Sequence, residues 1–364
     1  MGFVKQIALA GAGVLAAREI RRRIAPDDLD GQTALVTGGS RGLGLLISRE
    51  LARAGCHVAI CARDAAELER ASADLARFGG EVETVVCDVS DRVQVRRTID
   101  RVTARFGQID VLVNNAGVIQ VGPIENQTID DFQMAMDVMY WGIVYPSLAV
   151  LPQMRARGRG RIANVTSIGG KIAVPHLLPY SGAKFAAVGF SEGLAAEVAK
   201  DGITVTTIVP GLMRTGSHLH AQTKGQHEAE YGWFSLGASL PLISMDAEHA
   251  ARQVVQAIQR GESVRCLGVT AALASRFQGL FPGTTVELLG LVNRLLPAPG
   301  ARSTGTVPGY EARARLGSQL IEAATTLGRK AAERFNETHP TAQERETATS
   351  SDRRPDQTVG AAWR

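Results

Sequence analysis

Short apolar runs alternate with amphipathic stretches from Gly31 to about Leu267, and no other feature constrains the fold as strongly. The apolar runs predict buried strands at residues 34–36, 58–61, 82–87, 111–113, 161–165 and 204–209. Between the first of them, residues 44–54, 65–78 and 93–106 carry apolar side chains at helical intervals. Strand and helix repeated in this order predict a doubly wound α/β fold, a parallel sheet with helices on both faces.

Composition excludes several other classes of protein. With 45% hydrophobic and 21% charged residues over 364 positions, the chain is neither disordered nor fibrous and can bury a large core. A formal net charge of +4, without basic runs interleaved with aromatics, argues against a nucleic-acid partner. The HxH of His218 and His220 lacks a further ligand at a telling spacing, so no metal site is expected. The cysteines are too sparse for a disulfide framework: Cys56, Cys61, Cys87 and Cys266.

The first 29 residues differ from the α/β region. Residues 3–17 are apolar apart from Lys5 and Gln6, and arginines follow at positions 18, 21, 22 and 23. As a helix the apolar part spans roughly 22 Å, less than the roughly 30 Å hydrocarbon core of a bilayer. It predicts either an interfacial membrane anchor that leaves the main domain in the cytoplasm, or a helix docked on the protein's own surface.

The composition changes again near residue 270. We expect a catalytic domain over residues 30–270, a helical extension over 271–337 and a disordered tail over 338–364. The extension holds an apolar stretch at 277–296 and an Ala-rich, charged helical pattern at 311–337. In the apolar stretch, four residues recur at helical spacing: Val286, Leu289, Val292 and Leu296.

A glycine-rich turn directly follows the first predicted strand and opens a helix. Glycines permit the tight turn and let backbone amides approach a pyrophosphate at the positive end of that helix. Its context between strand and helix makes this turn a dinucleotide-binding signature. The turn reads Thr37, Gly38, Gly39, Ser40, Arg41, Gly42, Leu43 and Gly44.

The end of the second predicted strand indicates which dinucleotide binds. An acidic residue there accepts the ribose hydroxyls of NAD, whereas a basic one suits the 2′-phosphate of NADP. Arg63 holds this position, and Arg41 supplies a second cation for a phosphate clamp. We therefore favour NADP, although the adjacent Asp64 leaves NAD open.

Two further turns follow predicted strands. Asp88, with Val89 beside it, follows the third strand and is positioned to meet the adenine amino group. Asn115, Ala116 and Gly117 close the fourth. Asp, Asn and Gly are turn-forming residues, so local structure alone would also explain them.

Tyr180 and Lys184 are spaced to share one face of a helix. A neighbouring ammonium favours phenolate, which lowers the pKa of a tyrosine toward the range of a general acid–base. Ser167 follows the predicted strand at 161–165. A YxxxK pair is common by chance, but its combination with the glycine-rich turn, Asn115–Gly117 and a serine at this distance is not expected from chance.

In order and spacing these motifs resemble the short-chain dehydrogenase/reductase family, in its subgroup with a TGxxxGxG turn and a YxxxK pair. The resemblance covers about residues 31–267. It implies that Tyr180 donates or accepts the proton, that Lys184 lowers its pKa and binds the nicotinamide ribose, and that Ser167 bonds the substrate oxygen. It further implies that three residues line the nicotinamide and its phosphate, and that the chain forms a homo-oligomer. Those three residues are Pro210, Gly211 and Thr215.

Met139 departs from the family pattern. It stands where the family usually has an Asn that helps to hold a water in the proton relay, in a stretch that otherwise resembles VNxxG. A thioether cannot order water as an amide does. This departure suggests the alternative of a catalytically weak nucleotide-binding or scaffold protein.

The leading hypothesis is an NADP-dependent oxidoreductase that interconverts a carbonyl and an alcohol by hydride transfer. An epimerase or dehydratase on a similar fold is disfavoured by the glycine pattern. Residues 216–245 should form a lid that either suits a lipophilic substrate or simply packs on the domain. The lid is rich in large apolar side chains: Leu219, Tyr231, Trp233, Phe234, Leu236, Leu240 and Leu242.

Overall fold

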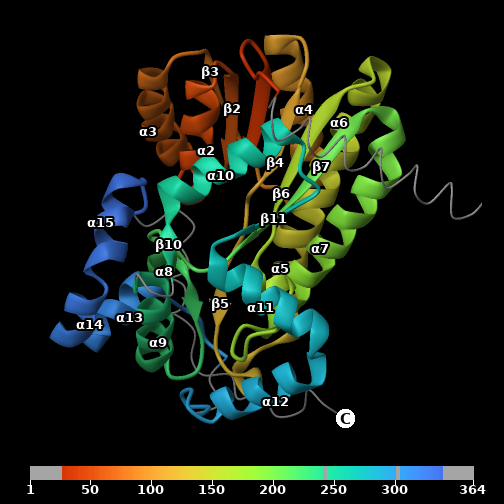
Figure 1. The fold of residues 1–364 in the computed structure, drawn as a ribbon. Helices are drawn as coiled ribbons and strands as arrows, with labels where there is room; N and C mark the ends of the chain where they lie inside the picture. Colours follow the sequence, from red (N-terminus) through yellow and green to blue (C-terminus); the bar gives the residue numbers. More distant parts are fainter. Residues whose placement is uncertain (1–26, 241–243, 301–303, 339–364) are drawn as a thin grey trace, which may run out of the picture.

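A seven-stranded parallel sheet forms the centre of the molecule in the computed structural model, which describes residues 27–240, 244–300 and 304–338 (Figure 1). Val36 pairs with Ile60 on one side and with Val113 on the other, which places the first strand in the middle. In sheet order the strands are β11 (Val264–Leu267), β7 (Ile203–Pro210), β6 (Gly160–Val165), β4 (Val111–Asn114), β1 (Thr33–Thr37), β2 (His57–Ala62) and β3 (Val82–Val86). This is the doubly wound fold that the sequence predicts.

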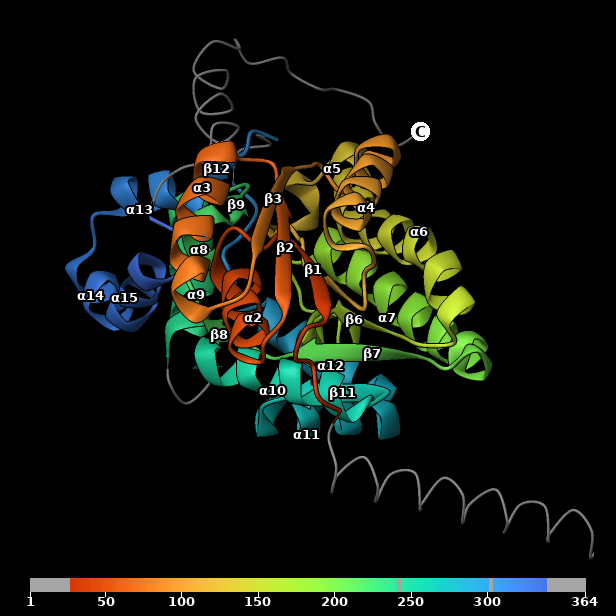
Figure 2. The same cartoon turned by 90° about the horizontal axis from the view of Figure 1, so that it is seen from above.

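Helices cover both faces of the sheet because successive strand side chains point to opposite sides. Ala34 and Val36 enter one core, under α2, α3 and α10, whereas Leu35 enters the other, under α4, α6 and α7. Figure 2 shows both layers along the sheet. The helices are α2 (Gly42–Arg53), α3 (Ala65–Leu75), α4 (Arg92–Phe106), α5 (Ile129–Met136), α6 (Gly142–Arg157), α7 (Leu178–Val198) and α10 (Ala247–Arg260).

All six predicted strands are confirmed to within one or two residues at each end. The seventh, β11, was not among them, because its half-exposed residues alternate too briefly to be told from a loop. A π-helical turn, Asp137–Trp141, joins α5 to α6. The combined run Ile129–Arg157 is long and apolar enough to cross a bilayer, but half of its most apolar window is buried within the fold. It therefore serves as a packing helix.

The predicted lid lies over the carboxyl ends of the strands. It contains β8 (Met213–Arg214), α8 (Ser217–His220), β9 (Gln222–Thr223) and α9 (His227–Ser239). A three-stranded sheet ties it down, since β9 lies between β5 (Gln120–Val121) and β12 (Val307–Pro308). A second small sheet pairs β8 with β10 (Met245–Asp246).

The C-terminal extension is helical but more divided than predicted. The apolar stretch at 277–296 spans two helices, α11 (Val269–Leu280) and α12 (Pro282–Asn293), because Pro282 starts a new helix. The pattern at 311–337 makes α13 (Gly309–Leu316), α14 (Gln319–Ala324) and α15 (Thr326–Arg334), and Gly317 in the left-handed region ends the first of them. Figures 1 and 2 show α13–α15 beside α8 and α9.

Several predictions fall outside the described residues. These are the apolar N-terminal segment with its arginine cluster, the tail beyond Thr338, and Leu242 in the lid.

Candidate active site

Ser167, Tyr180 and Lys184 meet beyond the carboxyl end of β6. Tyr180 and Lys184 lie one turn apart near the start of α7, with Lys184 Nζ 5.9 Å from the centre of the Tyr180 ring. Ser167 follows β6, and its side chain shares a hydrogen bond with Tyr180. The three side chains predicted as catalytic are therefore together.

Burial changes the acid–base properties of both titratable groups. It raises the pKa of Tyr180, and the hydrogen bond with Ser167 opposes that change. The expected lowering of this pKa by Lys184 is therefore wrong, because burial is the largest effect on the phenol. Burial lowers the pKa of Lys184 to about 8. Lys184 Nζ donates to the carbonyl of Val165 at 3.0 Å, so this strand end holds the ammonium in place.

Two glycines allow this close approach. A Cβ on Gly169 would lie 2.8 Å from a Tyr180 ring carbon, and one on Gly170 would lie 2.5 Å from the Lys184 carbonyl oxygen. The Gly169 amide also donates to Ser167 Oγ at 3.0 Å. The turn after β6 thus fixes the serine hydroxyl against the phenol.

The glycine-rich turn has the geometry that a dinucleotide requires. Gly38 has φ +62°, and its Cβ would lie 2.8 Å from the Ala116 Cα; a Cβ on Gly44 would lie 2.1 Å from the Gly38 carbonyl oxygen. Arg41 occupies the N-cap of α2 without capping it through its side chain, and the first amide of the helix, that of Gly42, donates to the Phe335 carbonyl at 2.9 Å. Ser40 and Leu43 are buried within the turn. The residues present fit a bound diphosphate.

Asp64 and Arg63 differ sharply in their surroundings at the end of β2. Asp64 is the N-cap of α3 and accepts the Glu67 amide at 2.9 Å, so its carboxylate serves the helix. Arg63 is exposed. Arg41 lies against Glu67 Oε1 at 3.1 Å and His220 Nδ1 at 2.9 Å, so a phosphate clamp would share it with these groups.

Asp88 and Asn115 lie at the carboxyl ends of β3 and β4, as predicted. Asp88 accepts the amide and the hydroxyl of Ser90. Asn115 holds the glycine-rich turn instead of projecting from it, because its Nδ2 donates to the carbonyls of Thr37 and Gly38. Val89 is buried.

The remaining predicted residues line the same region. Gly117 is exposed beside Lys184, whose Nζ would lie 3.9 Å from a Cβ on that glycine. Pro210 ends β7, and the Gly211 amide bonds the carbonyl of Leu267. The buried Thr215 hydroxyl bonds Ser217 Oγ at 2.9 Å.

Met139 lies in the π-helical turn and is fully buried, packed with Ala135, Ala183 and Tyr180. Its Cγ would lie 3.8 Å from a Cβ on Gly117. The thioether therefore fills apolar space beside Tyr180.

Apolar side chains surround Tyr180 on the lid side. Phe234 and Trp233 from α9 pack in one cluster with Tyr180. The other members of this cluster lie outside α9: Ile119, Val121, Val174, Leu177 and Ala221. Tyr231, also on α9, packs instead against Val307 and Ala312 of the C-terminal extension. The lid prediction is thus divided, with part of the lid facing the tyrosine and part covered by the extension.

A buried polar cluster fastens the lid to the loop before α7. His176 has φ +64°, and its Nδ1 lies 2.9 Å from Glu230 Oε1; Trp233 Nε1 donates to Glu230 Oε2 at 2.7 Å. No local pattern predicts this cluster, since His176 is 54 positions from Glu230.

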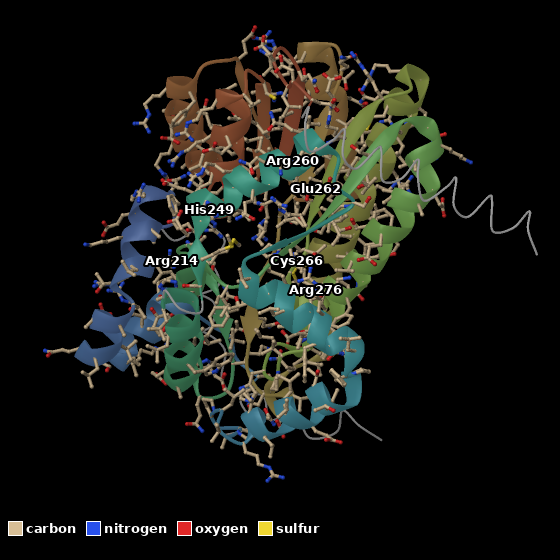
Figure 3. All side chains as sticks on the ribbon, in the orientation of Figure 1. Arg214, His249, Arg260, Glu262, Cys266 and Arg276 are labelled. Atoms are coloured by element: carbon tan, nitrogen blue, oxygen red, sulfur yellow. The ribbon has the colours of Figure 1, made fainter. Side chains whose placement is uncertain are left out.

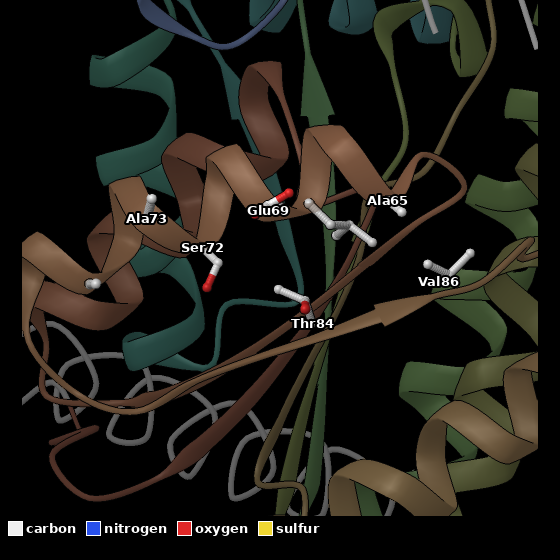
Figure 4. A pocket seen from close by; sticks show the side chains of 8 residues that line it. Ala65, Glu69, Ser72, Ala73, Thr84 and Val86 are labelled. Carbon is white, nitrogen blue, oxygen red and sulfur yellow. The ribbon is translucent and has the colours of Figure 1, made fainter. Parts of the chain in front are cut away.

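An open surface hollow of roughly 430 Å³ lies elsewhere, between α3 and the edge strand β3 (Figure 4). Ala65, Glu69, Ser72, Thr84 and Val86 line it. It contains none of the residues predicted for the site.

Comparisons with known proteins agree with this fold. A family model described as short chain dehydrogenase matches residues 32–225. The chain is 37% identical over 240 residues to a dehydrogenase/reductase SDR family protein 7-like of Anopheles gambiae, covering 64% of this chain and 74% of that one. It is 39% identical over 188 residues to oxidoreductase UcpA of Escherichia coli K12, covering 51% and 71%. A solved short-chain dehydrogenase from Streptomyces avermitilis aligns with a TM-score of 0.62 at 29% identity, covering 72% and 97%.

Proposed function

The chain belongs to the short-chain dehydrogenase family of oxidoreductases, and from this premise we propose that it is an NADP(H)-dependent enzyme that interconverts a lipophilic carbonyl and its alcohol. The observation that carries the proposal is the meeting of Ser167, Tyr180 and Lys184 beside the glycine-rich turn. When bound, the nicotinamide supplies or accepts the hydride at the carbonyl carbon.

In the direction of reduction, Tyr180 Oη donates the proton to the carbonyl oxygen, and Ser167 Oγ donates a hydrogen bond to the same oxygen. The raised pKa of Tyr180 keeps its proton available at neutral pH. The Lys184 ammonium, held by the Val165 carbonyl, stabilises the phenolate that remains. In oxidation the same groups act in reverse.

Substitution of Tyr180 tests this assignment. Tyr180→Phe removes only the hydroxyl, so dinucleotide binding should persist while turnover falls at least 100-fold, the range of general acid–base contributions. Tyr145→Phe on α6 is the matched control, since that ring stacks on Trp141 away from the site. Turnover by Tyr180→Phe within a few-fold of the parent would contradict the role of Tyr180.

The preference for NADP rests on the end of β2. Asp64 is committed to capping α3, whereas Arg63 is exposed and cationic. Arg63→Asp should weaken NADP binding by about 1.5–3 kcal/mol, the contribution of a hydrogen bond to a charged group. Tighter binding of NAD than of NADP by the parent protein would refute the preference.

The apolar cluster of Phe234, Trp233 and Leu177 around Tyr180 supports a lipophilic substrate. A panel of carbonyls of increasing chain length, followed by NADPH absorbance, tests it. We expect kcat/KM to rise with apolar length by up to about tenfold for each two buried methylenes. A flat or falling series would contradict a lipophilic pocket.

Met139 stands where the family usually has Asn, so no side-chain amide at this position orders water. This difference favours the alternative of a weakly catalytic nucleotide-binding protein. Met139→Asn separates the two functions. A large gain in turnover would identify the parent as catalytically weak, whereas an unchanged or lower rate would show that the relay does not need this amide.

We also propose that the enzyme is cytoplasmic and docks on an anionic bilayer through α11 and α12. This helix pair has one buried residue in each helix, Ala271 and Thr285, and exposes Leu280 at 73% and Val286 at 66%. Its charges are Arg276, labelled in Figure 3, Arg294 and the single acid Glu287. An apolar face with a net positive charge matches anionic headgroups. The N-terminal arginine cluster would add to this attraction.

Vesicle flotation tests the docking surface. The parent should float with phosphatidylserine-containing vesicles, and Leu280→Glu with Val286→Glu should abolish flotation. Leu320→Glu on α14, at a site 84% exposed, is the control and should float like the parent. Failure of the parent to float, or flotation of the double variant, would refute docking; a dimer that dissociates in the double variant would identify a second copy as the occupant.

The homo-oligomer implied by the family resemblance would use a different surface. Leu148 on α6 and Phe185 on α7 are large, exposed and apolar. Sedimentation should show an oligomer for the parent and a monomer for Phe185→Glu. A monomeric parent would contradict this proposal.

A further inference from the structure

The last described residues of the chain return to the glycine-rich turn. The Gly42 amide donates to the Phe335 carbonyl at 2.9 Å, and Asn336 Nδ2 donates to the Ser40 carbonyl at 2.9 Å. Phe335 is buried in the core beneath α2, and Glu337 is 4% exposed. Phe335–Glu337, here called the C-terminal latch, therefore covers the turn that the dinucleotide must reach.

The Glu337 carboxylate lies between the two sides of the predicted phosphate site. Its Oε1 lies 3.0 Å from the position of a Cβ on Gly42, at the N-terminus of α2. Its Oε2 accepts the Gly216 amide, next to Thr215 on the opposite side. The amides of Gly42 and Gly216 are main-chain donors that the dinucleotide phosphates would use. The Phe335 carbonyl now accepts the first and the Glu337 carboxylate the second.

The charges around Glu337 complete an anion site. Burial raises the pKa of Glu337, whereas His220, Arg41 and the Gly216 amide stabilise the carboxylate and the buried Glu67 acts against it. His220 also lies 3.0 Å from the Glu337 carbonyl through its Nε2, and 2.9 Å from Arg41 through its Nδ1. A phosphate in this place would meet the same Arg41 guanidinium, but it would be repelled by the carboxylate already there.

We propose that the C-terminal latch is a built-in competitor of the dinucleotide: Glu337 holds the phosphate site closed, and the cofactor binds only when the latch has moved away. This inference rests on the proposed function of the site. It goes beyond that function because it makes cofactor affinity depend on a segment that follows the catalytic domain.

The packing of the extension permits such movement. The neighbouring α14 has no buried residue and is held from its surface, by Ile321 against the Tyr231 cluster and by the ion pairs of Glu322 with Arg313 and Arg329. Asn336 has φ +60°, an uncommon conformation for a residue with a side chain. By contrast, α13 is fixed by Ala312 and by the pairing of β12 with β9. The latch can leave while α13 stays on the lid.

Opening the latch should strengthen cofactor binding. The apparent affinity equals the intrinsic affinity multiplied by the fraction of molecules in which the latch is open, so a larger open fraction raises it. Glu337→Gln removes the charge while keeping the size of the side chain. We expect it to bind NADPH roughly tenfold or more tightly than the parent, the equivalent of one charged hydrogen bond. Glu333→Gln, an exposed position on α15, is the matched control and should bind like the parent.

The experiment measures the affinities of the three full-length proteins for NADPH, NADH and inorganic pyrophosphate by titration calorimetry. Hydrogen exchange of the amides in 333–338 is measured alongside, with and without NADPH. Displacement of the latch predicts faster exchange in the parent on addition of NADPH. Simple removal of a negative charge would tighten binding without changing this exchange.

The outcomes separate this inference from the proposed function. Equal NADPH affinity in the parent and Glu337→Gln, or exchange that NADPH leaves unchanged or slows, would overturn the latch and leave the oxidoreductase intact. If none of the three proteins binds a dinucleotide but Glu337→Gln binds pyrophosphate more tightly than the parent, the latch is supported and the proposed dinucleotide dependence is wrong. If no protein binds either dinucleotide or pyrophosphate, both are wrong.

Discussion

His218 should make the stability of this enzyme fall in mild acid. The side chain is fully buried where α8 meets the C-terminal extension, and a Cβ on Gly328 would lie 2.9 Å from its Cε1. Burial lowers its pKa from the ordinary 6.5 to about 4; a backbone hydrogen bond at Thr215 opposes this, and the neighbouring Arg313, His220 and Arg329 add to it. The folded chain therefore keeps this imidazole neutral.

The sign and size follow from proton linkage. Between about pH 6.5 and pH 4 the unfolded chain binds a proton that the folded chain does not, so the free energy of unfolding falls as pH falls. The stabilisation is fully present above pH 6.5. At pH 5 the loss is about 2 kcal/mol, and it approaches about 3 kcal/mol near pH 4.

Urea unfolding followed by circular dichroism at about pH 7.5, 6, 5 and 4.5 measures this loss. His218→Gln removes the titrating group, so its free energy of unfolding should fall by about 2 kcal/mol less than that of the parent between pH 7.5 and 5. His249→Gln, an exposed histidine of α10 labelled in Figure 3, should follow the parent. Parallel curves for the parent and His218→Gln would refute the claim that burial holds this residue neutral.

Three further predictions concern the site and its supports. Burial lowers the pKa of Lys184 to about 8, so the rate of carbonyl reduction should fall as pH rises through 8. A pH–rate profile that stays flat between about pH 7 and 9.5 would contradict the role of the ammonium. Gly44→Ala should lower the free energy of unfolding by about 1–3 kcal/mol and abolish dinucleotide binding, since its Cβ would lie 2.1 Å from the Gly38 carbonyl oxygen. Gly193→Ala is the control, because it has open space around it and should stabilise α7. Glu230→Gln should raise KM for the substrate more than it lowers kcat, because the neutral amide holds His176 and Trp233 less strongly than the carboxylate does. An unchanged KM would show that this cluster does not position the lid.

Much of this protein is determined locally and could be predicted from sequence. The apolar runs of β1, β2 and β4 read as buried strands because both faces of a parallel sheet are covered. The glycine-rich turn and the pair Tyr180 and Lys184 could be identified because their geometry depends on neighbours a few positions away.

Contacts between distant segments were decided by the tertiary structure alone. Glu337 reaches Gly42 and Gly216, and Glu230 reaches His176, through surfaces that no periodicity relates. Asn115 shows the same limit at one residue, since its position was predicted but its bonds to the glycine-rich turn depend on where β1 and β4 meet. Local propensity and spacing specify elements, whereas the charges and shapes that meet when those elements pack specify which groups share a site.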